Sequence, residues 1–145
     1  MKLYLDTSLV VTALVMEPSS AAIVEWLERQ NSHRFVISDW VVAEFSAALS
    51  VKLRSNRIYA EAQERALARL ADLITSEFEC LPVTREHFRQ AAAFCNRSFV
   101  GLRAGDALHL AIAASSTLKL CTRDRLQAEA GAGLGVLTEF VPSLP

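Results

Sequence analysis

Three acidic residues stand alone in apolar parts of the sequence, whereas most of its acids lie in charged segments. Asp6, Glu44 and Asp106 are each the only charge in a long uncharged stretch. Removing a carboxylate from water costs several kcal/mol unless a partner compensates. If the three acids converge in space, their repulsion requires cations. An oxygen-rich cluster with little histidine or cysteine favours Mg²⁺ or Mn²⁺.

Each acid also has a simpler interpretation when it is taken alone. Asp6 and Asp106 could be the N-caps of the helices that follow them. Glu44 could be a core acid paired with an arginine. A fourth candidate, Asp124, has a weaker signal because an arginine stands on each side of it, and a turn or cap role is its simpler interpretation. The hypothesis of a shared site therefore rests on the joint pattern.

The elements that must position these acids alternate between strand and helix along the chain. We predict short strands at 3–5, 35–37, 80–83, 118–121 and 136–138, and helices at about 9–16, 20–30, 38–53, 59–76, 84–96, 107–115 and 123–130. Pro82 lacks the amide that a central strand uses, so its strand should lie at an edge. This alternation predicts an α/β fold with a parallel sheet covered on both faces. Asp6 and Asp124 would then follow strands at the carboxyl edge, where such sheets bind ligands.

Composition sets further bounds on the class of protein. The 145 residues predict a single domain over 1–138 and a loose tail over 139–145, and a net charge of −1 creates no field that would attract nucleic acid in general. The cysteines at 80, 95 and 121 show no disulfide or zinc spacing, and each is expected to be a small buried hydrophobe. We expect a cytoplasmic protein without a signal peptide or a membrane span, because the first strand begins at residue 3 and the apolar runs are short.

Four segments of the sequence resemble the PIN-domain ribonucleases, and in particular the VapC toxins of type II toxin–antitoxin pairs. The matching segments are LYLDTS at 3–8, ISDWVVAEF at 37–45, LRAGDALHLA at 102–111 and LCTRD at 120–124. The resemblance implies a PIN-like three-layer α/β/α fold with a central parallel sheet of about five short strands. It also implies a metal-dependent endoribonuclease that hydrolyses RNA phosphodiester bonds.

The resemblance further implies roles for particular residues and partners. The acidic quartet that holds Mg²⁺ or Mn²⁺ would be Asp6, Glu44, Asp106 and Asp124, with Ser8 and Thr122 in support. Many relatives carry an aromatic residue shortly after the fourth acid, whereas this chain reads Arg-Leu-Gln at 125–127. The family also implies a cognate VapB-like antitoxin, and homodimers are common in it.

Other basic residues and one histidine lie near these acids in the sequence. The RNA backbone could be gripped by arginines that flank the site, although each could equally be a plain surface residue: Arg97, Arg103, Arg123 and Arg125. His109 follows Asp106 by one helical turn and is expected to pack on its helix rather than take part in catalysis.

Other classes of function fit the sequence less well. A haloacid-dehalogenase-type phosphatase would need a second aspartate where Ser8 stands, and a receiver domain would need its acids placed differently. A dinucleotide-binding fold would need GxGxxG after the first strand, which this chain lacks. The remaining alternative is a non-catalytic PIN-fold module that binds RNA or protein, and acids at all four positions argue against it.

Overall fold

The computed structural model describes residues 2–30 and 34–142 and contains a five-stranded parallel sheet in the order β3-β2-β1-β4-β5. The strands are β1 (Lys2–Leu5), β2 (Arg34–Ser38), β3 (Glu79–Leu81), β4 (Lys119–Thr122) and β5 (Thr138–Phe140). The helices are α1 (Thr7–Leu14), α2 (Ser20–Arg29), α3 (Asp39–Arg54), α4 (Ala60–Ser76), α5 (Arg85–Arg97), α6 (Ala104–Ser115) and α7 (Arg125–Gly133).

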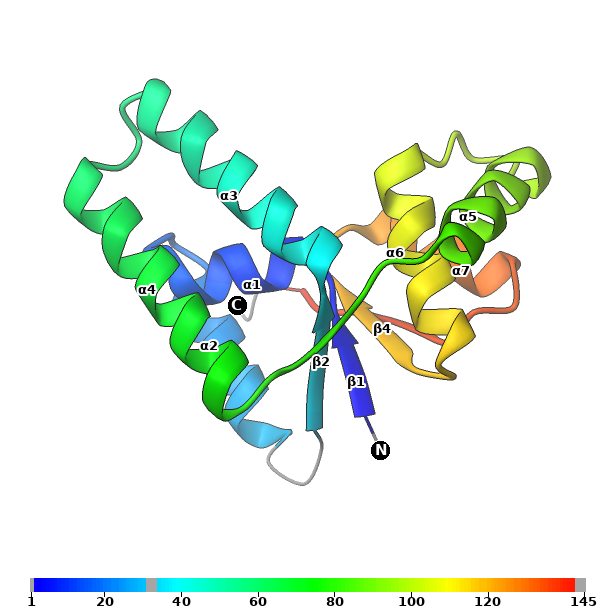
Figure 1. Cartoon of the computed structure of the whole chain (residues 1–145), viewed down its shortest axis with the longest axis horizontal. Coiled ribbons are helices and arrows are strands. Elements are labelled where there is room, and N and C mark those ends of the chain that lie inside the picture. Colours follow the sequence, from blue (N-terminus) through cyan, green and yellow to red (C-terminus); the bar gives the residue numbers. More distant parts are fainter. Residues whose placement is uncertain (1, 31–33, 143–145) are drawn as a thin grey trace.

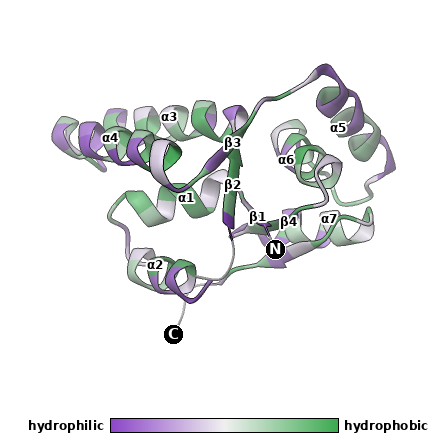
Figure 2. Cartoon of the chain, turned by 60° about the horizontal axis from the view of Figure 1, so that its bottom comes forward, coloured by the Kyte–Doolittle hydropathy of each residue, from purple (hydrophilic) through white to green (hydrophobic). Residues whose placement is uncertain are grey.

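The helices form two layers with the sheet between them. Helices α1 to α4 lie on one side of the strands, and α5 to α7 lie on the other (Figures 1 and 2). Parallel strands require crossover connections, and helices on both faces supply them. The predicted three-layer α/β/α fold with five short parallel strands is therefore confirmed.

The order of the strands reverses at the centre of the sheet. The chain first adds β2 and β3 on one side of β1, and after α5 and α6 it returns to add β4 and β5 on the other side. The amide of Asp6 donates to the carbonyl of Cys121 at 3.0 Å, which extends the pairing of β1 with β4 to the end of both strands. In open α/β sheets, ligands bind in the crevice outside the carboxyl ends of the strands at such a switch point.

The core lies on both faces of the central strands. Three consecutive residues of β1 are buried, Leu3, Tyr4 and Leu5, as expected for a strand that is covered on both faces. Helix α3 was expected to be apolar on most sides. Its fully buried residues form a single stripe, with one residue per turn: Val41, Phe45 and Leu49. The stripe has the spacing of an amphipathic helix.

Several local expectations can be compared with the structure. Strand β3 stands at one end of the strand order, next to β2, so the edge position inferred from Pro82 is confirmed. The last strand was expected at 136–138 but runs from Thr138 to Phe140, so part of the segment assigned to the tail pairs with β4. Cys121 is buried as expected, whereas Cys80 and Cys95 are only partly buried. Residues 143–145 of the predicted tail lie outside the described residues.

No helix within residues 2–30 and 34–142 combines the length and the apolar character needed to cross a membrane.

Candidate metal centre

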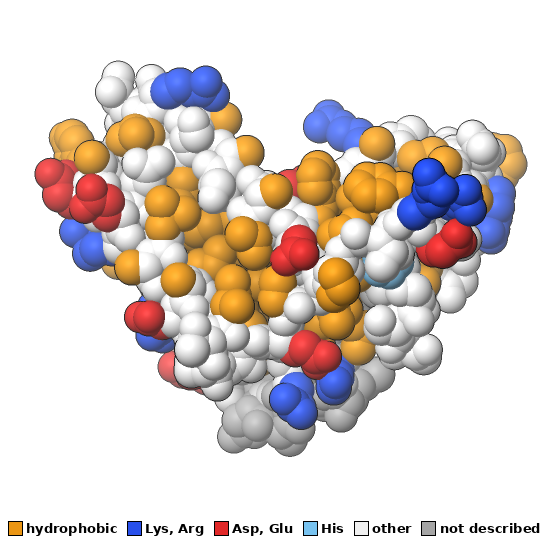
Figure 3. All heavy atoms as spheres, viewed as in Figure 1, with side chains coloured by type: hydrophobic (Ala, Val, Ile, Leu, Met, Phe, Trp, Pro, Cys, Tyr) orange, Lys and Arg blue, Asp and Glu red, His pale blue; other side chains and the backbone are white. Residues whose placement is uncertain are grey.

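The four acids lie at the carboxyl edge of the sheet, around the switch point. Asp6 follows β1 and caps α1, Glu44 lies in α3, Asp106 lies in the first turn of α6, and Asp124 caps α7. Figure 3 shows a wide notch between the two helical layers at this end of the molecule, with hydrophobic side chains exposed on its walls. A cleft of about 640 Å³ is lined by Trp40, Glu44, Arg103, Gly105, Asp106, Asp124 and Leu126.

Asp6 is anchored by donors from both ends of the chain. Its Oδ2 accepts from the hydroxyl of Ser8 at 2.7 Å, from the amide of Ser8 at 3.3 Å and from the hydroxyl of Thr122 at 3.0 Å. Its Oδ1 lies 3.3 Å from Nε2 of His109. Asp6 is therefore both the helix cap of the simpler interpretation and a member of the acidic group. Ser8 and Thr122 both contact it, and their supporting role stays a prediction.

Glu44 is anchored in the same way, through one of its two oxygens. Oε1 accepts from the hydroxyl of Thr7 at 2.7 Å and from Nε2 of His109 at 2.5 Å. Oε2 lies toward α6, 3.3 Å from the position of a Cβ added to Gly105. Burial alone would raise the pKa of Glu44, but the hydrogen bonds from His109 and Thr7 and the charge of His109 hold it below its usual value.

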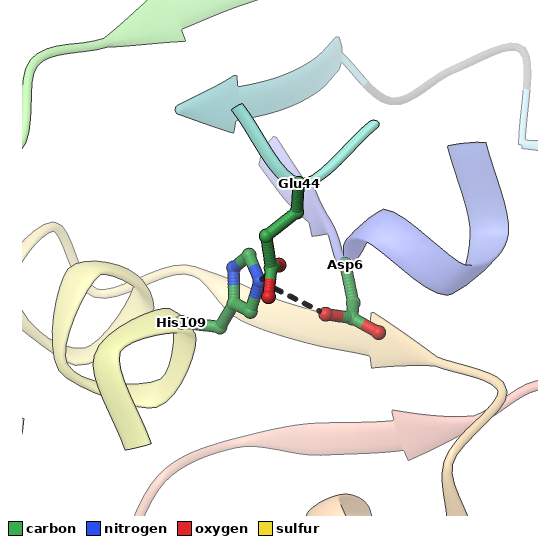
Figure 4. Close-up of side chains that lie close together, drawn as sticks. All are labelled: Asp6, Glu44 and His109. Atoms are coloured by element: carbon green, nitrogen blue, oxygen red, sulfur yellow. Dashed lines mark hydrogen bonds and ion pairs between the residues drawn. The ribbon is translucent and has the colours of Figure 1, made fainter. Parts of the chain in front are cut away.

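His109 is buried on its helix, as expected, but it also contacts two of the acids. Its ring points toward the carboxylates of Glu44 and Asp6 (Figure 4), and the ligand atoms of these three residues all lie within 4.8 Å of one another. Burial lowers the pKa of His109, but its hydrogen bond to Glu44 and the nearby carboxylates outweigh that effect and raise it. The spacing from Asp106 was a usable signal, because residues three apart share a helix face.

Asp106 lies where negative charges accumulate. The pKa of its carboxyl is raised to about 6, most by burial and further by the charges of Asp6, Asp124 and Glu44. His109 opposes it only in part. In the first turn of α6 the carboxylate also benefits from the helix dipole. The site is thus an incompletely neutralised group of carboxylates, which is the electrostatic condition for binding a cation.

Asp124 is held by Thr122 and by Gln127, a residue that the sequence did not single out. The amide of Asp124 donates to the hydroxyl of Thr122 at 3.0 Å, and Oδ1 of Asp124 accepts from the amide of Gln127 at 3.2 Å. The side chain of Gln127 is buried and donates to the carbonyl of Asp106 at 3.3 Å. Gln127 follows the fourth acid closely, in the segment where relatives carry an aromatic residue, and it ties two acid-bearing segments together.

The four arginines proposed for RNA binding have different positions. Only Arg103 is among the residues that line the cleft. Arg97 lies over the ring of Phe94, and Arg125 lies 4.2 Å from the centre of the Phe140 ring. The side chain of Arg123 donates to Ser19 at 3.3 Å.

A divalent cation fits the donors that converge here. Asp6 and Glu44 each use one oxygen to accept two or more protein hydrogen bonds, so their positions are fixed before any ligand arrives. Asp106 and Asp124 line the same cleft as Glu44 but lie outside the closely spaced group of Asp6, Glu44 and His109. Carboxylate oxygens are the ligands that suit Mg²⁺ and Mn²⁺.

Comparison with known proteins agrees with the fold and with the topology around this site. The model of the PIN domain family matches residues 3–133. One chain of the VapBC2 complex from Rickettsia felis, solved with a DNA fragment from its promoter, is 17% identical, with a TM-score of 0.71 and coverage of 97% of this chain and 98% of that chain. VapC20 from Mycobacterium tuberculosis, a Sarcin-Ricin loop cleaving toxin, is 16% identical, with a TM-score of 0.71 and coverage of 93% of this chain and 96% of that chain.

A chain of FitAcB from Neisseria gonorrhoeae is 19% identical, with a TM-score of 0.65 and coverage of 95% of this chain and 96% of that chain. The search of curated proteins found no match. These structural likenesses establish the fold, and the family model covers most of the chain. The protein therefore belongs to the PIN domain family.

Proposed function

We propose that this protein is a Mg²⁺- or Mn²⁺-dependent endoribonuclease and the toxin of a toxin–antitoxin pair. The observation that carries the proposal is the convergence of Asp6, Glu44, Asp106 and Asp124 at the switch point of a PIN-domain sheet. A fold that needed these acids only as helix caps would not gather Glu44 and Asp106 with them. Such a group is costly without a cation and useful with one.

The four acids would hold one or two ions, with the anchored carboxylates of Asp6 and Glu44 presenting the oxygens that protein donors do not already occupy. A bound divalent ion lowers the pKa of water and neutralises charge on a phosphodiester during hydrolysis. Thr7, Ser8 and Thr122 hold the acids through hydroxyl donors, so the carboxylates need not reorganise when a ligand arrives. Arg103, which lines the cleft, would contact the backbone of an RNA strand.

The toxin role and the antitoxin partner are supported by the similar structures. Their names describe VapBC and FitAB assemblies and a toxin that cleaves the Sarcin-Ricin loop. By analogy, this chain would act in the cytoplasm, bind a VapB-like antitoxin that covers the cleft, and form a homodimer. Co-expression with a small open reading frame found beside this gene, followed by purification, would test the partner.

An RNA-cleavage assay tests the enzymatic proposal and separates it from a non-catalytic RNA- or protein-binding module. The protein is incubated with total RNA and Mg²⁺ or Mn²⁺, and parallel reactions contain EDTA. We expect cleavage that EDTA abolishes and that Asp6→Asn or Glu44→Gln reduces at least about a hundredfold, since the substituted groups act together at one site. Asp72→Asn alters an exposed acid far from the cleft on α4 and should cleave normally. Full activity of Asp6→Asn would rule out the assignment.

A further inference from the structure

A chain of buried polar groups runs behind the acids and ends at Glu44. The hydroxyls of Ser38 and Tyr4 are 2.7 Å apart, and the hydroxyl of Tyr4 lies 2.8 Å from Nδ1 of His109. Ser38 and Tyr4 are fully buried and His109 is 1% exposed. The chain links side chains from the end of β2, from β1 and from α6. Buried polar groups of this kind must satisfy one another, because water does not reach them.

The hydrogen-bond partners allow donation along this chain from Ser38 toward Glu44. The hydroxyl oxygen of Ser38 accepts from the amide of Val41 at 3.3 Å, so its proton can be donated to Tyr4. The Tyr4 hydroxyl can then donate to Nδ1 of His109, which leaves a proton on Nε2. That proton faces Oε1 of Glu44 at 2.5 Å. A fully protonated ring would carry the same Nε2 proton, so donation to Glu44 holds in either state.

His109 is better placed as a donor to Glu44 than as a ligand of the ion. Nε2 of His109 lies within hydrogen-bond distance of Oε1 of Glu44, so a proton donated to Oε1 occupies the direction in which Nε2 would bind an ion. Thr7 donates to the same oxygen at 2.7 Å. Oε1 is therefore occupied by protein donors, and Oε2, near Gly105, is the oxygen available to the cleft.

We propose that Tyr4 and His109 are positioning residues that orient the Glu44 carboxylate for the cation, with His109 as donor and not as ligand. The inference rests on the proposed function, because it takes Glu44 to be a ligand of the cation. Tyr4 would act through His109 from the far side of the ring, without reaching the cleft. A hydrogen bond behind a ligand of this type typically changes metal affinity by about tenfold or more.

The first test reads the histidine ring nitrogens by NMR in the metal-free protein and again with Mg²⁺. The His109 signals are assigned by their loss in His109→Gln. We expect a proton on Nε2 that exchanges slowly with solvent and persists when Mg²⁺ is added. In Tyr4→Phe, which removes only a hydroxyl, we expect this proton to exchange at least about tenfold faster. Loss of the Nε2 proton on adding Mg²⁺ would make His109 a ligand and overturn the proposal.

The second test measures Mn²⁺ affinity by calorimetry. Tyr4→Phe should bind Mn²⁺ about tenfold more weakly and should lose kcat for RNA with little change in KM. Thr12→Val is the matched control, because it also removes one buried hydroxyl, which faces Glu17 at 3.3 Å instead of the site. Its Mn²⁺ affinity should equal that of the unaltered protein. Equal affinity in Tyr4→Phe and Thr12→Val would contradict the positioning role.

The two measurements also separate this inference from the proposed function. If the unaltered protein bound no Mn²⁺, the proposed function would fail, and the assignment of Glu44 to a cation would fail with it. The Nε2 proton would still report whether Tyr4 holds His109 against Glu44, since that signal is read without metal.

Discussion

The hydroxyl of Thr122 donates to Oδ2 of Asp6 at 3.0 Å, although 116 positions separate the two residues in the chain. The contact joins the ends of β1 and β4, the two strands between which the order of the sheet reverses. The same hydroxyl accepts from the amide of Asp124 at 3.0 Å. One buried side chain therefore sets the position of two of the four acids, and the topology of the sheet is what brings it there.

Thr122→Val should damage the site more than the fold. The change removes the donor to Asp6 and the acceptor for Asp124, while its size and β-branching suit a buried strand. We expect RNA cleavage to fall by about ten- to a hundredfold and the free energy of unfolding to fall by about 1–2 kcal/mol. Thr138→Val removes a hydroxyl that donates to the carbonyl of Ala128 at 2.8 Å, away from the cleft, and should keep its activity. Equal activity of the two variants would contradict this role of Thr122.

Asp106→Asn should make the metal-free protein more stable at neutral pH. The folded-state pKa of Asp106 is raised to about 6, so between about pH 4 and 6 the folded state binds more protons than the unfolded chain. The stability of the unaltered protein therefore falls as pH rises through that window. Asparagine removes this loss, and we expect a gain of about 1–2 kcal/mol at pH 7.5 after allowance for solvent screening.

Urea unfolding in EDTA at pH 4.5 and 7.5 measures the effect of Asp106→Asn. The gain should be present at the higher pH and largely absent at the lower one, where the native carboxyl is already protonated. Added Mg²⁺ should then stabilise the unaltered protein more than the variant. A variant that is less stable at pH 7.5 would show that Asp106 has a compensating partner in the fold.

Gly105→Ala should reduce activity with little effect on folding. An added Cβ would lie 3.3 Å from Oε2 of Glu44 and 3.5 Å from the ring of Trp40. The position is helical, where alanine is favoured over glycine by up to about 1 kcal/mol, so stability should be kept or improved. The oxygen that we assign to the cation would have to move by a few tenths of an ångström. We expect a loss of about tenfold in cleavage rate.

Gly133→Ala is the matched control for this glycine substitution. Gly133 is the last residue of α7, and a Cβ added there meets nothing within 4 Å. It should cleave RNA at the unaltered rate. Equal activity of Gly105→Ala and Gly133→Ala would contradict the assignment of Oε2 of Glu44 to the cation.

Arg103→Ala should weaken RNA binding, whereas Arg97→Ala should not. Only Arg103 lines the cleft, and Arg97 lies over the ring of Phe94. Binding of a labelled RNA to the inactive Asp6→Asn protein would be measured at several salt concentrations. Loss of one phosphate contact should lower the slope of log affinity against log salt by about 0.7 for a single strand. Equal slopes for both variants would remove Arg103 from the RNA site.

Most of the fold was predictable because strands and helices alternate with clear periodicity. The sequence alone places Asp6 and Asp124 at one edge of a parallel sheet, since each follows a strand. Pro82 marked an edge strand for the same kind of local reason. The position of β5 was less certain, because the glycines that precede it leave several possible starting points.

The parts of the site that could not be predicted depend on contacts between distant segments. In the sequence His109 is one residue of an apolar helix. Its neighbours in the sequence do not indicate that the hydroxyl of Tyr4 lies against its Nδ1. Gln127 was likewise unremarkable in sequence, yet it binds both α6 and the segment of Asp124. Such contacts depend on the order of the strands in the sheet. The alternation of strands and helices in the sequence does not determine that order.

The central claim is that distant carboxylates share a divalent ion, and Mn²⁺ titration followed by electron paramagnetic resonance tests it most directly. The unaltered protein should bind Mn²⁺ with a saturable stoichiometry of one or two ions, and Asp6→Asn should lose that binding while Asp72→Asn retains it. Binding that is absent in the unaltered protein, or unchanged in a folded Asp6→Asn protein, would contradict the account.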